Sequence, residues 1–395
     1  MNTPRFQIRA DHPDFLDLPW EEPIDSWDHP RLVSMPEGVH RHPIVFVAYG
    51  DTVYAIKELP RRYALVEFDV LLSLEEHTHR SAQAAGLVER VWLDPHSEQS
   101  AAVITTYVRH AFPYRDLIAG TGFGPRREQM VDALAGLLVE LHLAGCYWGD
   151  CSLSNVLCRY DASTIEAIMI DAETSALHDE LSTGQRREDL AIMIENIAGE
   201  MGDIAAVAGD DIDGADLWLG TDIAERYRVL WTELNEELII GSDQGYKARQ
   251  RVARLNELGF SVGSVELEPT ESGDRVKLTV EVGDRTFHSD RLRELTGINA
   301  SENQAQYILN DVNTYIPATE TSGLGKSLAA IKWRLGSFEP CIAWIDQNWH
   351  GSDPVQGFCD FLQFRRGMAE SRGTDIANDE ALTAWKGSGF QGFPT

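Results

Sequence analysis

The chain has 395 residues and a formal net charge of −29, with 43% hydrophobic and 25% charged residues. At roughly 100–200 residues per domain, this length predicts two or three domains. The acidic balance argues against binding to nucleic acid and against docking onto anionic membranes, and it is typical of a surface that keeps a protein in solution.

Other features of the sequence bear on the cell compartment. No apolar run reaches the ~18 residues that cross a membrane. Residues 1–5 lack the basic-then-apolar pattern of a signal peptide, so we expect a cytoplasmic protein. The five cysteines form no Cys-x-x-Cys pair, and the clustered Cys146, Cys151 and Cys158 fit no common zinc spacing. We therefore expect free, buried thiols.

The first strands are predicted after an acidic segment rich in Pro and Trp, residues 1–30, which we expect to form an irregular arm. Residues 44–48 and 53–59 are β-branched or alternating runs that flank a turn, and this pattern predicts a hairpin. Alternation puts Ala55 and Lys57 on one face. The small side chain leaves room for an adenine ring, and the ammonium can reach the α- and β-phosphates of ATP. A solvated strand lysine is the alternative.

A helix is predicted next, over residues 61–79, because its apolar residues recur at helical spacing. Glu67 lies within this apolar stripe. A buried carboxylate without a partner is unfavourable, and Lys57 on the preceding strand is the natural partner. The predicted stripe consists of Tyr63, Val66, Val70, Leu71 and Leu74.

A buried strand is predicted over residues 101–108, followed by a second amphipathic helix over residues 126–143. Two short strands, residues 155–159 and 165–170, follow across a turn. The residues assigned to nucleotide binding are Ala55, Lys57, Glu67, Tyr107 and Val108.

The loop between the second helix and these strands has an Asp-x-x-x-x-Asn spacing, which lets one loop present two polar groups. Asp150 would orient the attacking hydroxyl and accept its proton, and Asn155 would bind Mg²⁺. An ordinary helix–strand loop is the alternative. The long helix before the motif and the hairpin after it favour the catalytic interpretation.

An acidic residue ends the second strand of that hairpin. Asp171 follows the apolar run 167–170 and comes sixteen residues after Asn155. This is where a second Mg²⁺ ligand is needed, and carboxylate oxygens are ligands that this ion prefers. Taken alone, the residue could also be no more than the exit of a strand.

The C-terminal part of the chain shows a different pattern. Residues 188–200 predict a helix, and the pattern breaks near residues 199–220. A new unit follows, with a helix over residues 246–258, two or three strands, and helices over residues 301–315 and 328–335. The order predicts an α+β fold of two lobes, β-rich then mainly helical, followed by a smaller α/β domain. The predicted divisions are residues 31–108, 109–229 and 230–395.

Together these motifs resemble those of the protein-kinase-like superfamily. Residues 55–57 resemble its strand-lysine motif, residues 149–155 its catalytic loop, and residues 171–173 its Asp-Phe-Gly position. The resemblance implies an ATP- and Mg²⁺-dependent kinase in which Lys57 and Asp150 are catalytic.

A narrower resemblance is to the Kdo/lipopolysaccharide-core kinase-like family, of the actinobacterial type that has a C-terminal domain of unknown function. The segments that carry it are residues 67–71, 171–174 and 255–260. The kinase-like part spans about residues 30–225 and the C-terminal part about residues 230–370. The acceptor hydroxyl is left open among a sugar, another small molecule and a protein side chain.

Three departures from protein kinases matter. Trp148 and Gly149 replace the His-Arg that precedes the catalytic Asp, which argues against switching through a phosphorylated activation loop. The phosphate loop has one glycine, Gly38, between residues 31 and 49, and an Ala-Pro-Glu motif is absent. These features favour an atypical kinase. The main alternative is a nucleotide-binding pseudokinase scaffold whose C-terminal domain binds a protein partner, and nucleotidyl transfer is a weaker one.

Two further motifs need an interpretation. Residues 323–327 resemble the end of a P-loop, but Glu320 stands where that motif needs glycine, so a second nucleotide site is not expected. Asp189 is a candidate for capping or bridging the catalytic loop. Trp344 and Trp349 could line an acceptor pocket, although packing in a core is the better interpretation.

Overall fold

The structure is a computed structural model of the whole chain. It describes residues 3–35, 41–118, 123–209, 213–241, 244–270, 275–317, 322–351 and 353–393. Gly38, the glycine of the expected phosphate loop, lies outside the described residues. The chain forms two compact units. Unit 1 comprises residues 1–159 and 166–230, and unit 2 comprises residues 160–165 and 231–395.

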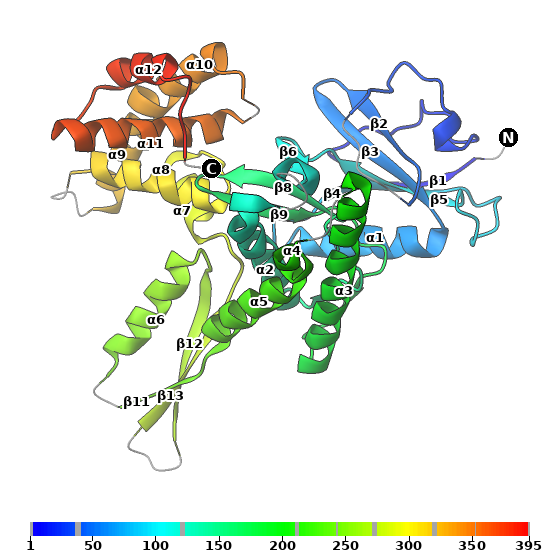
Figure 1. Ribbon diagram of the computed structural model, residues 1–395, viewed down its shortest axis with the longest axis horizontal. Coiled ribbons are helices and arrows are strands. Elements are labelled where there is room, and N and C mark those ends of the chain that lie inside the picture. Colours follow the sequence, from blue (N-terminus) through cyan, green and yellow to red (C-terminus); the bar gives the residue numbers. More distant parts are fainter. Residues whose placement is uncertain are drawn as a thin grey trace. The chain divides into compact units, whose positions relative to one another are not determined.

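The first lobe of unit 1 is an antiparallel sheet of five strands in the order β1-β4-β5-β3-β2. Helix α1 packs against β4 and β5 (Figure 1). The predicted hairpin is confirmed as β2 and β3, with Ala55 and Lys57 on β3. The elements are β1 (Arg5–Ile8), β2 (Ile44–Tyr49), β3 (Thr52–Leu59), α1 (Arg61–Leu74), β4 (Gln83–Glu89) and β5 (Ala101–Thr106).

The N-terminal segment has an irregular backbone over most of residues 3–30, but it packs into the first lobe and is not a separate arm. Its strand β1 pairs with β4, and a 3₁₀ turn follows at Ile24–Ser26. Phe15, Trp20 and Trp27 are buried in a core that includes the sheet. Large aromatic side chains bury enough apolar area to hold an otherwise irregular backbone in place. The segment is therefore a packed part of the first lobe.

Helix α1 buries most of the predicted stripe, because Val70, Leu71 and Leu74 are buried. The first turn differs from the prediction: Tyr63 is 38% exposed and Val66 is only partly buried. Ala64 and Phe68 complete the buried face in their place. Glu67 stays within the buried face and is 2% exposed.

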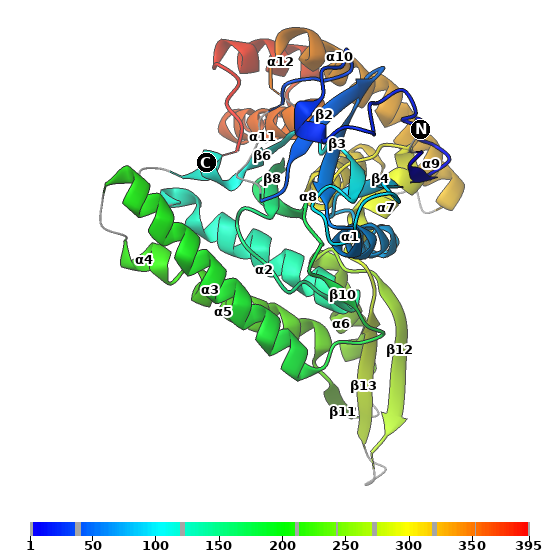
Figure 2. The same ribbon diagram turned by 90° about the vertical axis from the view of Figure 1, so that its right-hand side faces the viewer.

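The second lobe of unit 1 is mainly helical (Figure 2). Helix α2 is buried on nearly all sides, so it forms the centre of the lobe. Strands β6, β8 and β9 form a small sheet, and β7 pairs with β10. The elements are β6 (Ala111–Pro113), α2 (Arg127–Leu143), β7 (Cys146–Tyr147), β8 (Val156–Asp161), β9 (Thr164–Met169), β10 (Ala176–Leu177), α3 (Thr183–Ala208), α4 (Gly214–Leu217) and α5 (Leu219–Asn235), with 3₁₀ turns at Tyr114–Leu117 and Gly124–Arg126.

Helix α3 is longer than the helix predicted over residues 188–200, with 26 residues. It begins with a capping box, in which the side chains of Ser182 and Gln185 each accept a hydrogen bond from the other's backbone N–H. It ends at Gly209, whose positive φ of 75° closes the helix. Sequence periodicity missed the first turn because Thr183, Gly184 and Gln185 carry no apolar signal.

Unit 2 combines a three-stranded sheet of order β11-β13-β12 with a helical bundle. The bundle has its own core, to which Trp333, Phe358 and Trp385 contribute the largest side chains. The elements are β11 (Leu238–Gly241), α6 (Tyr246–Glu257), β12 (Val262–Pro269), β13 (Arg275–Val282), α7 (Phe287–Thr296), α8 (Glu302–Tyr315), α9 (Gly323–Trp333), a π-helical turn at Arg334–Phe338, α10 (Glu339–Asn348), α11 (Pro354–Arg372) and α12 (Asn378–Gly387).

The turn of the β8–β9 hairpin belongs to unit 2. The fully buried Asp161 carboxylate accepts hydrogen bonds from the backbone N–H groups of Asn303 at 3.1 Å and Gln304 at 2.6 Å, so it caps the start of α8. Ala162 donates its N–H to the Gln356 side chain at 2.8 Å and lies in the helical core.

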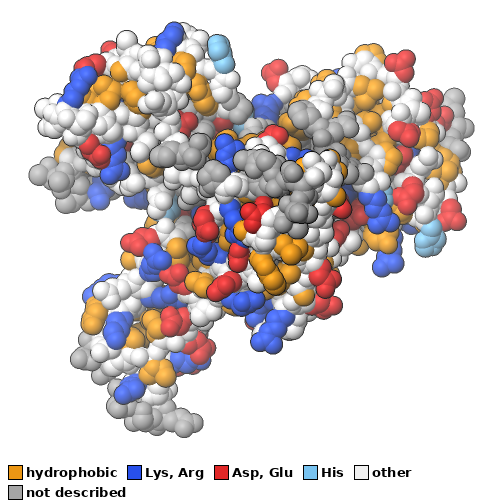
Figure 3. Space-filling view, viewed as in Figure 1, with side chains coloured by type: hydrophobic (Ala, Val, Ile, Leu, Met, Phe, Trp, Pro, Cys, Tyr) orange, Lys and Arg blue, Asp and Glu red, His pale blue; other side chains and the backbone are white. Residues whose placement is uncertain are grey.

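The surface and the hydropathy agree with the composition. On the face drawn in Figure 3, acidic and basic side chains are interspersed. None of the helices formed by the described residues is long and apolar enough to cross a membrane. All five cysteines are free and buried, as predicted, and burial raises the pKa of the Cys151 thiol well above its usual value.

Candidate active site

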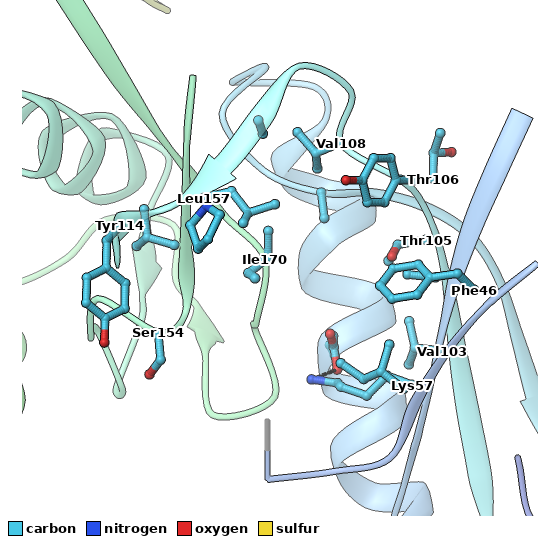
Figure 4. A pocket seen from close by; sticks show the side chains of 18 of the residues that line it. Phe46, Lys57, Val103, Thr105, Thr106, Val108, Tyr114, Ser154, Leu157 and Ile170 are labelled. Carbon is cyan, nitrogen blue, oxygen red and sulfur yellow. Dashed lines mark ion pairs between the residues drawn. The ribbon is translucent and has the colours of Figure 1, made fainter. Parts of the chain in front are cut away.

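A pocket of about 250 Å³ opens within unit 1 between strands of the first lobe and the β8–β9 region. Figure 4 shows Lys57, Val103 and Thr105 on one side of it, and Leu157 and Ile170 toward the other. The apolar walls suit a flat ring, and a charged group stands at one end. All five residues assigned to nucleotide binding line the pocket: Ala55, Lys57, Glu67, Tyr107 and Val108.

Lys57 is the centre of an ion-pair cluster. Its Nζ lies 2.7 Å from Glu67 Oε2, 3.0 Å from Asp171 Oδ1 and 3.4 Å from Glu173 Oε2. The predicted pairing of Lys57 with Glu67 is therefore present. We call these four residues the lysine cluster.

The charges of the lysine cluster depend on one another. Burial alone would lower the pKa of Lys57, but the carboxylates of Glu67, Asp171 and Glu173 outweigh it and raise that pKa, which keeps the ammonium charged. Carboxylate oxygens of these three residues lie within 4.8 Å of one another. Three carboxylates around one ammonium leave excess negative charge, and hard oxygen donors of this kind fit Mg²⁺.

His42 extends the cluster toward the edge of the sheet. Its Nε2 lies 3.2 Å from Glu173 Oε2, and its Nδ1 lies 3.0 Å from Glu98 Oε2. The hydrogen bond with Glu173 raises the pKa of His42. Burial raises the pKa of Glu173, but His42 and Lys57 outweigh this and lower it to about 2. Sequence reasoning missed His42, which lies in no motif or periodic stripe. It also missed the role of Glu173, because the motif at residues 171–173 drew attention to Asp171 alone.

Asp150 and Asn155 lie in one turn, which we call the catalytic loop, residues 148–155. Asn155 donates its side-chain amide to the Asp150 carbonyl at 2.9 Å and to Asp150 Oδ2 at 3.4 Å. Gly149 has a φ of 78°, and a Cβ there would lie 2.9 Å from the Thr174 carbonyl oxygen. Glycine is therefore required at the entry to the loop.

The catalytic loop is tied to the segment that carries Asp171. The indole of the fully buried Trp148 donates to the Asp171 carbonyl at 2.9 Å. The backbone N–H of Ile170 donates to the Asn155 carbonyl at 3.1 Å. Trp148, which departs from the protein-kinase pattern, thus has a defined structural role. It fixes the backbone of the segment that carries Asp171 relative to the loop that carries Asp150.

The electrostatic environment of Asp150 reflects its closeness to the segment that carries Asp171 and Glu173. Burial raises the pKa of the Asp150 carboxyl, a hydrogen bond from Asn196 opposes the rise, and the charges of Asp171 and Glu173 add to it. Asp150, Asn155 and Asp171 do not themselves line the pocket. Three residues adjacent to them in the chain line the pocket: Ser154, Val156 and Ile170.

Acidic side chains of helix α3 accept hydrogen bonds from the backbone of the catalytic loop. The buried Asp189 carboxylate accepts the backbone N–H groups of Trp148 and Gly149, both at 2.8 Å, as its candidate bridging role predicted. It also lies 3.0 Å from His142 Nε2. Glu200 accepts the N–H groups of Leu153 at 2.7 Å and Ser154 at 2.9 Å. Sequence reasoning missed Glu200, because charged residues on an amphipathic helix usually face water.

The remaining candidates from the sequence, residues 323–327 and two tryptophans, have structural roles. Residues 323–327 form the first turn of α9, where the Ser327 hydroxyl donates to the Gly323 carbonyl. Trp344 and Trp349 are partly buried against the core of unit 2. The interpretation of both tryptophans as packing residues is therefore the one that the structure supports.

Two family models match the chain. The lipopolysaccharide kinase (Kdo/WaaP) family matches residues 51–209, and the domain of unknown function DUF4032 matches residues 229–388. No curated protein matches the chain. Among solved structures, "WaaP in complex with acyl carrier protein" is 17% identical, with a TM-score of 0.36, and the match covers 56% of this chain and 99% of that one. The chain therefore combines a domain of the lipopolysaccharide kinase (Kdo/WaaP) family with a DUF4032 domain, as the sequence resemblance implied.

Proposed function

We propose that the chain is a kinase that transfers the γ-phosphoryl group of ATP to a hydroxyl group, with Mg²⁺ as cofactor. One observation carries the proposal: Lys57 stands on the wall of an apolar pocket with Glu67 at 2.7 Å and Asp171 at 3.0 Å. The family match supports phosphotransfer of the kinase type. In this proposal residues 31–108 and 109–229 act as the two kinase lobes.

The pocket supplies the nucleotide site of the proposal. The adenine ring would lie between the apolar walls, beside Ala55, Tyr107 and Val108. Lys57 would contact the α- and β-phosphates, because its ammonium stays charged in the lysine cluster. Its ion pair with the buried Glu67 holds the side chain toward the pocket, so the phosphates meet a positioned cation.

Asn155 and Asp171 would hold Mg²⁺, and Glu173 offers a third oxygen donor. The bound ion would neutralise charge on the phosphates. The fit rests on donor chemistry, since the carboxylates outnumber the ammonium at this point of unit 1.

Asp150 would act on the acceptor. Its carboxylate orients the hydroxyl and accepts its proton as the acceptor oxygen forms a bond to the γ-phosphorus. The bond between that phosphorus and the β,γ-bridging oxygen breaks, and ADP leaves with the electron pair. The proton then passes from Asp150 to solvent. The acceptor is a sugar, another small molecule or a protein side chain.

The first test is binding and turnover of ATP by the full chain. We expect Mg²⁺ and ATP together to stabilise the fold, by about 2.7 kcal/mol when ATP is at a hundred times its Kd. Asp150→Asn should keep this stabilisation, because the carboxyl group is replaced by an amide of the same shape. Its turnover should fall by about 10²–10⁴-fold, the usual contribution of a general base.

The acceptor can be sought in the same experiment. Cell extract is incubated with γ-labelled ATP and either the wild-type chain or Asp150→Asn, and label that depends on Asp150 marks the acceptor. Equal turnover by both proteins would refute the proposal. Mg²⁺-dependent binding without transfer to any component would favour the alternative, a pseudokinase scaffold whose residues 230–395 bind a protein partner.

A further inference from the structure

One face of helix α3 meets the catalytic loop. Asp189, Asn196 and Glu200 are separated by seven and four positions, so they lie on the same side of a helix with 3.6 residues per turn. The two carboxylates accept backbone N–H groups from the two ends of the loop. Asn196, between them, is the residue of this face that reaches a side chain proposed to be catalytic.

The contact of Asn196 is short and directional. Its side-chain amide donates to Asp150 Oδ1 at 2.8 Å and to the carbonyl of Cys151 at 3.2 Å. Both donors of one NH₂ group thus bind adjacent groups of the loop. The fully buried Cys151 anchors the second contact, so the amide is held in one orientation.

We propose that Asn196 is a positioning residue that fixes the Asp150 carboxylate and leaves Oδ2 as the oxygen that accepts the acceptor's proton. The inference rests on the proposed kinase function. Oδ1 is occupied by the amide at 2.8 Å, whereas Oδ2 has a contact of 3.4 Å with Asn155. The more weakly bound oxygen is the one free to bind a hydroxyl.

The chemistry of an amide suits this task. A cation at the same place would neutralise the carboxylate and reduce its capacity to take a proton, whereas a neutral donor fixes its direction and leaves its charge. Asp189 and Glu200 restrain the backbone on either side. The remaining freedom of Asp150 is rotation of its side chain, and the Asn196 amide removes it.

The test uses hydrolysis of MgATP by the full chain, with water as the acceptor. Asn196→Ala removes the donor, and Asn196→Asp replaces it with an acceptor of the same shape that repels Asp150. Glu195→Ala is the matched control, because Glu195 is the preceding residue of α3 and is exposed. Thermal midpoints of all variants report folding.

Asn196→Ala should lower kcat by about 10- to 100-fold, the effect of misplacing a catalytic group. The KM for ATP should stay at the wild-type value, because Asn196 is not among the residues that line the pocket. Asn196→Asp should lower kcat further, and Glu195→Ala should behave as wild type. A purely structural role would change the thermal midpoint without this separation of kcat from KM.

The outcomes separate the two proposals. If Asp150→Asn abolishes hydrolysis and both Asn196 variants keep the wild-type kcat, the positioning role is refuted and the kinase proposal stands. If Asn196→Ala fails to fold, the near-isosteric Asn196→Asp decides. If wild type and Asp150→Asn hydrolyse MgATP equally, both proposals are refuted. If neither hydrolyses MgATP, the same variants are compared by transfer of label from γ-labelled ATP to cell extract, and equal transfer by wild type and Asn196→Ala refutes the positioning role.

Discussion

The two sides of the candidate site are held together by different forces. The lysine cluster is a network of ion pairs between one ammonium and three carboxyl groups, on two parts of the chain more than a hundred residues apart. The catalytic loop is held by hydrogen bonds from one helix, in which the carboxylates of Asp189 and Glu200 accept backbone N–H groups. The first side is a set of interdependent charges, and the second is a backbone fixed on a rigid support.

This difference predicts how substitutions on each side affect stability and turnover. Removing one charge from a buried group leaves its partners unpaired, which is strongly unfavourable in a low dielectric. Removing one hydrogen bond from the loop leaves its neighbours in place, so the loss is smaller and more local. The lysine cluster should therefore be the more sensitive side in stability, and the loop the more sensitive in turnover alone.

The largest effect is expected for Lys57→Met, which leaves Glu67, Asp171 and Glu173 without their shared cation. We expect a loss of about 3–5 kcal/mol of unfolding free energy, as for breaking a buried ion pair. Urea unfolding followed by tryptophan fluorescence measures it. Lys326→Met, at an exposed position of α9, is the control and should be neutral. A Lys57→Met protein as stable as this control would contradict the interdependence of the cluster.

A smaller effect is expected on the loop side for Asp189→Asn. The amide keeps one acceptor oxygen but sets a second donor against a loop N–H group, so about 1.5–3 kcal/mol should be lost. Asp203→Asn, an exposed position on the same helix, is the control. Equal losses of unfolding free energy for Asp189→Asn and Lys57→Met would contradict the predicted difference between the two sides.

The smallest effect is a pH dependence at the edge of the lysine cluster. The raised pKa of His42 means that its contribution to stability is complete below pH about 6.5 and is lost as the pH rises through the folded-state value. The lowered pKa of Glu173 means that its contribution is complete above pH about 4.5 and is lost toward about 2. The pair is therefore strongest between these limits.

The measurement is the thermal midpoint across pH 5 to 9 in the presence of a chelator, for wild type and His42→Gln. We expect wild type to lose at most about 1 kcal/mol relative to the variant as the pH rises, because the pair is partly screened by solvent. Parallel curves for both proteins would show that His42 does not contribute through its charge.

Much of unit 1 was predictable, because its signals are local. Alternation identified β2 and β3, and helical spacing identified α2 almost to its ends. The pairing of Lys57 with Glu67 followed from the rule that a carboxylate in an apolar stripe needs a partner. The roles of Asp150, Asn155 and Asp171 in catalysis and metal binding remain predictions.

What the sequence did not reveal depends on contacts between distant segments. Residues 3–30 pack into the first lobe because their aromatic side chains are buried in its core, and no local sequence pattern indicates this. Asn196 and Glu200 look like polar positions of an amphipathic helix until the catalytic loop is placed over them. His42 precedes its strand in an irregular segment, where side-chain direction has no period.

The turn at Asp161 and Ala162 has a consequence for how such a protein can be assembled. The helix cap of α8 and part of the bundle's core are encoded between Asn155 and Asp171, far in sequence from residues 229–388, which match DUF4032. A chimera that joins residues 231–395 to another partner at one junction would lack both. The C-terminal domain therefore cannot be transferred to another protein by itself, and this hairpin must be transferred with it.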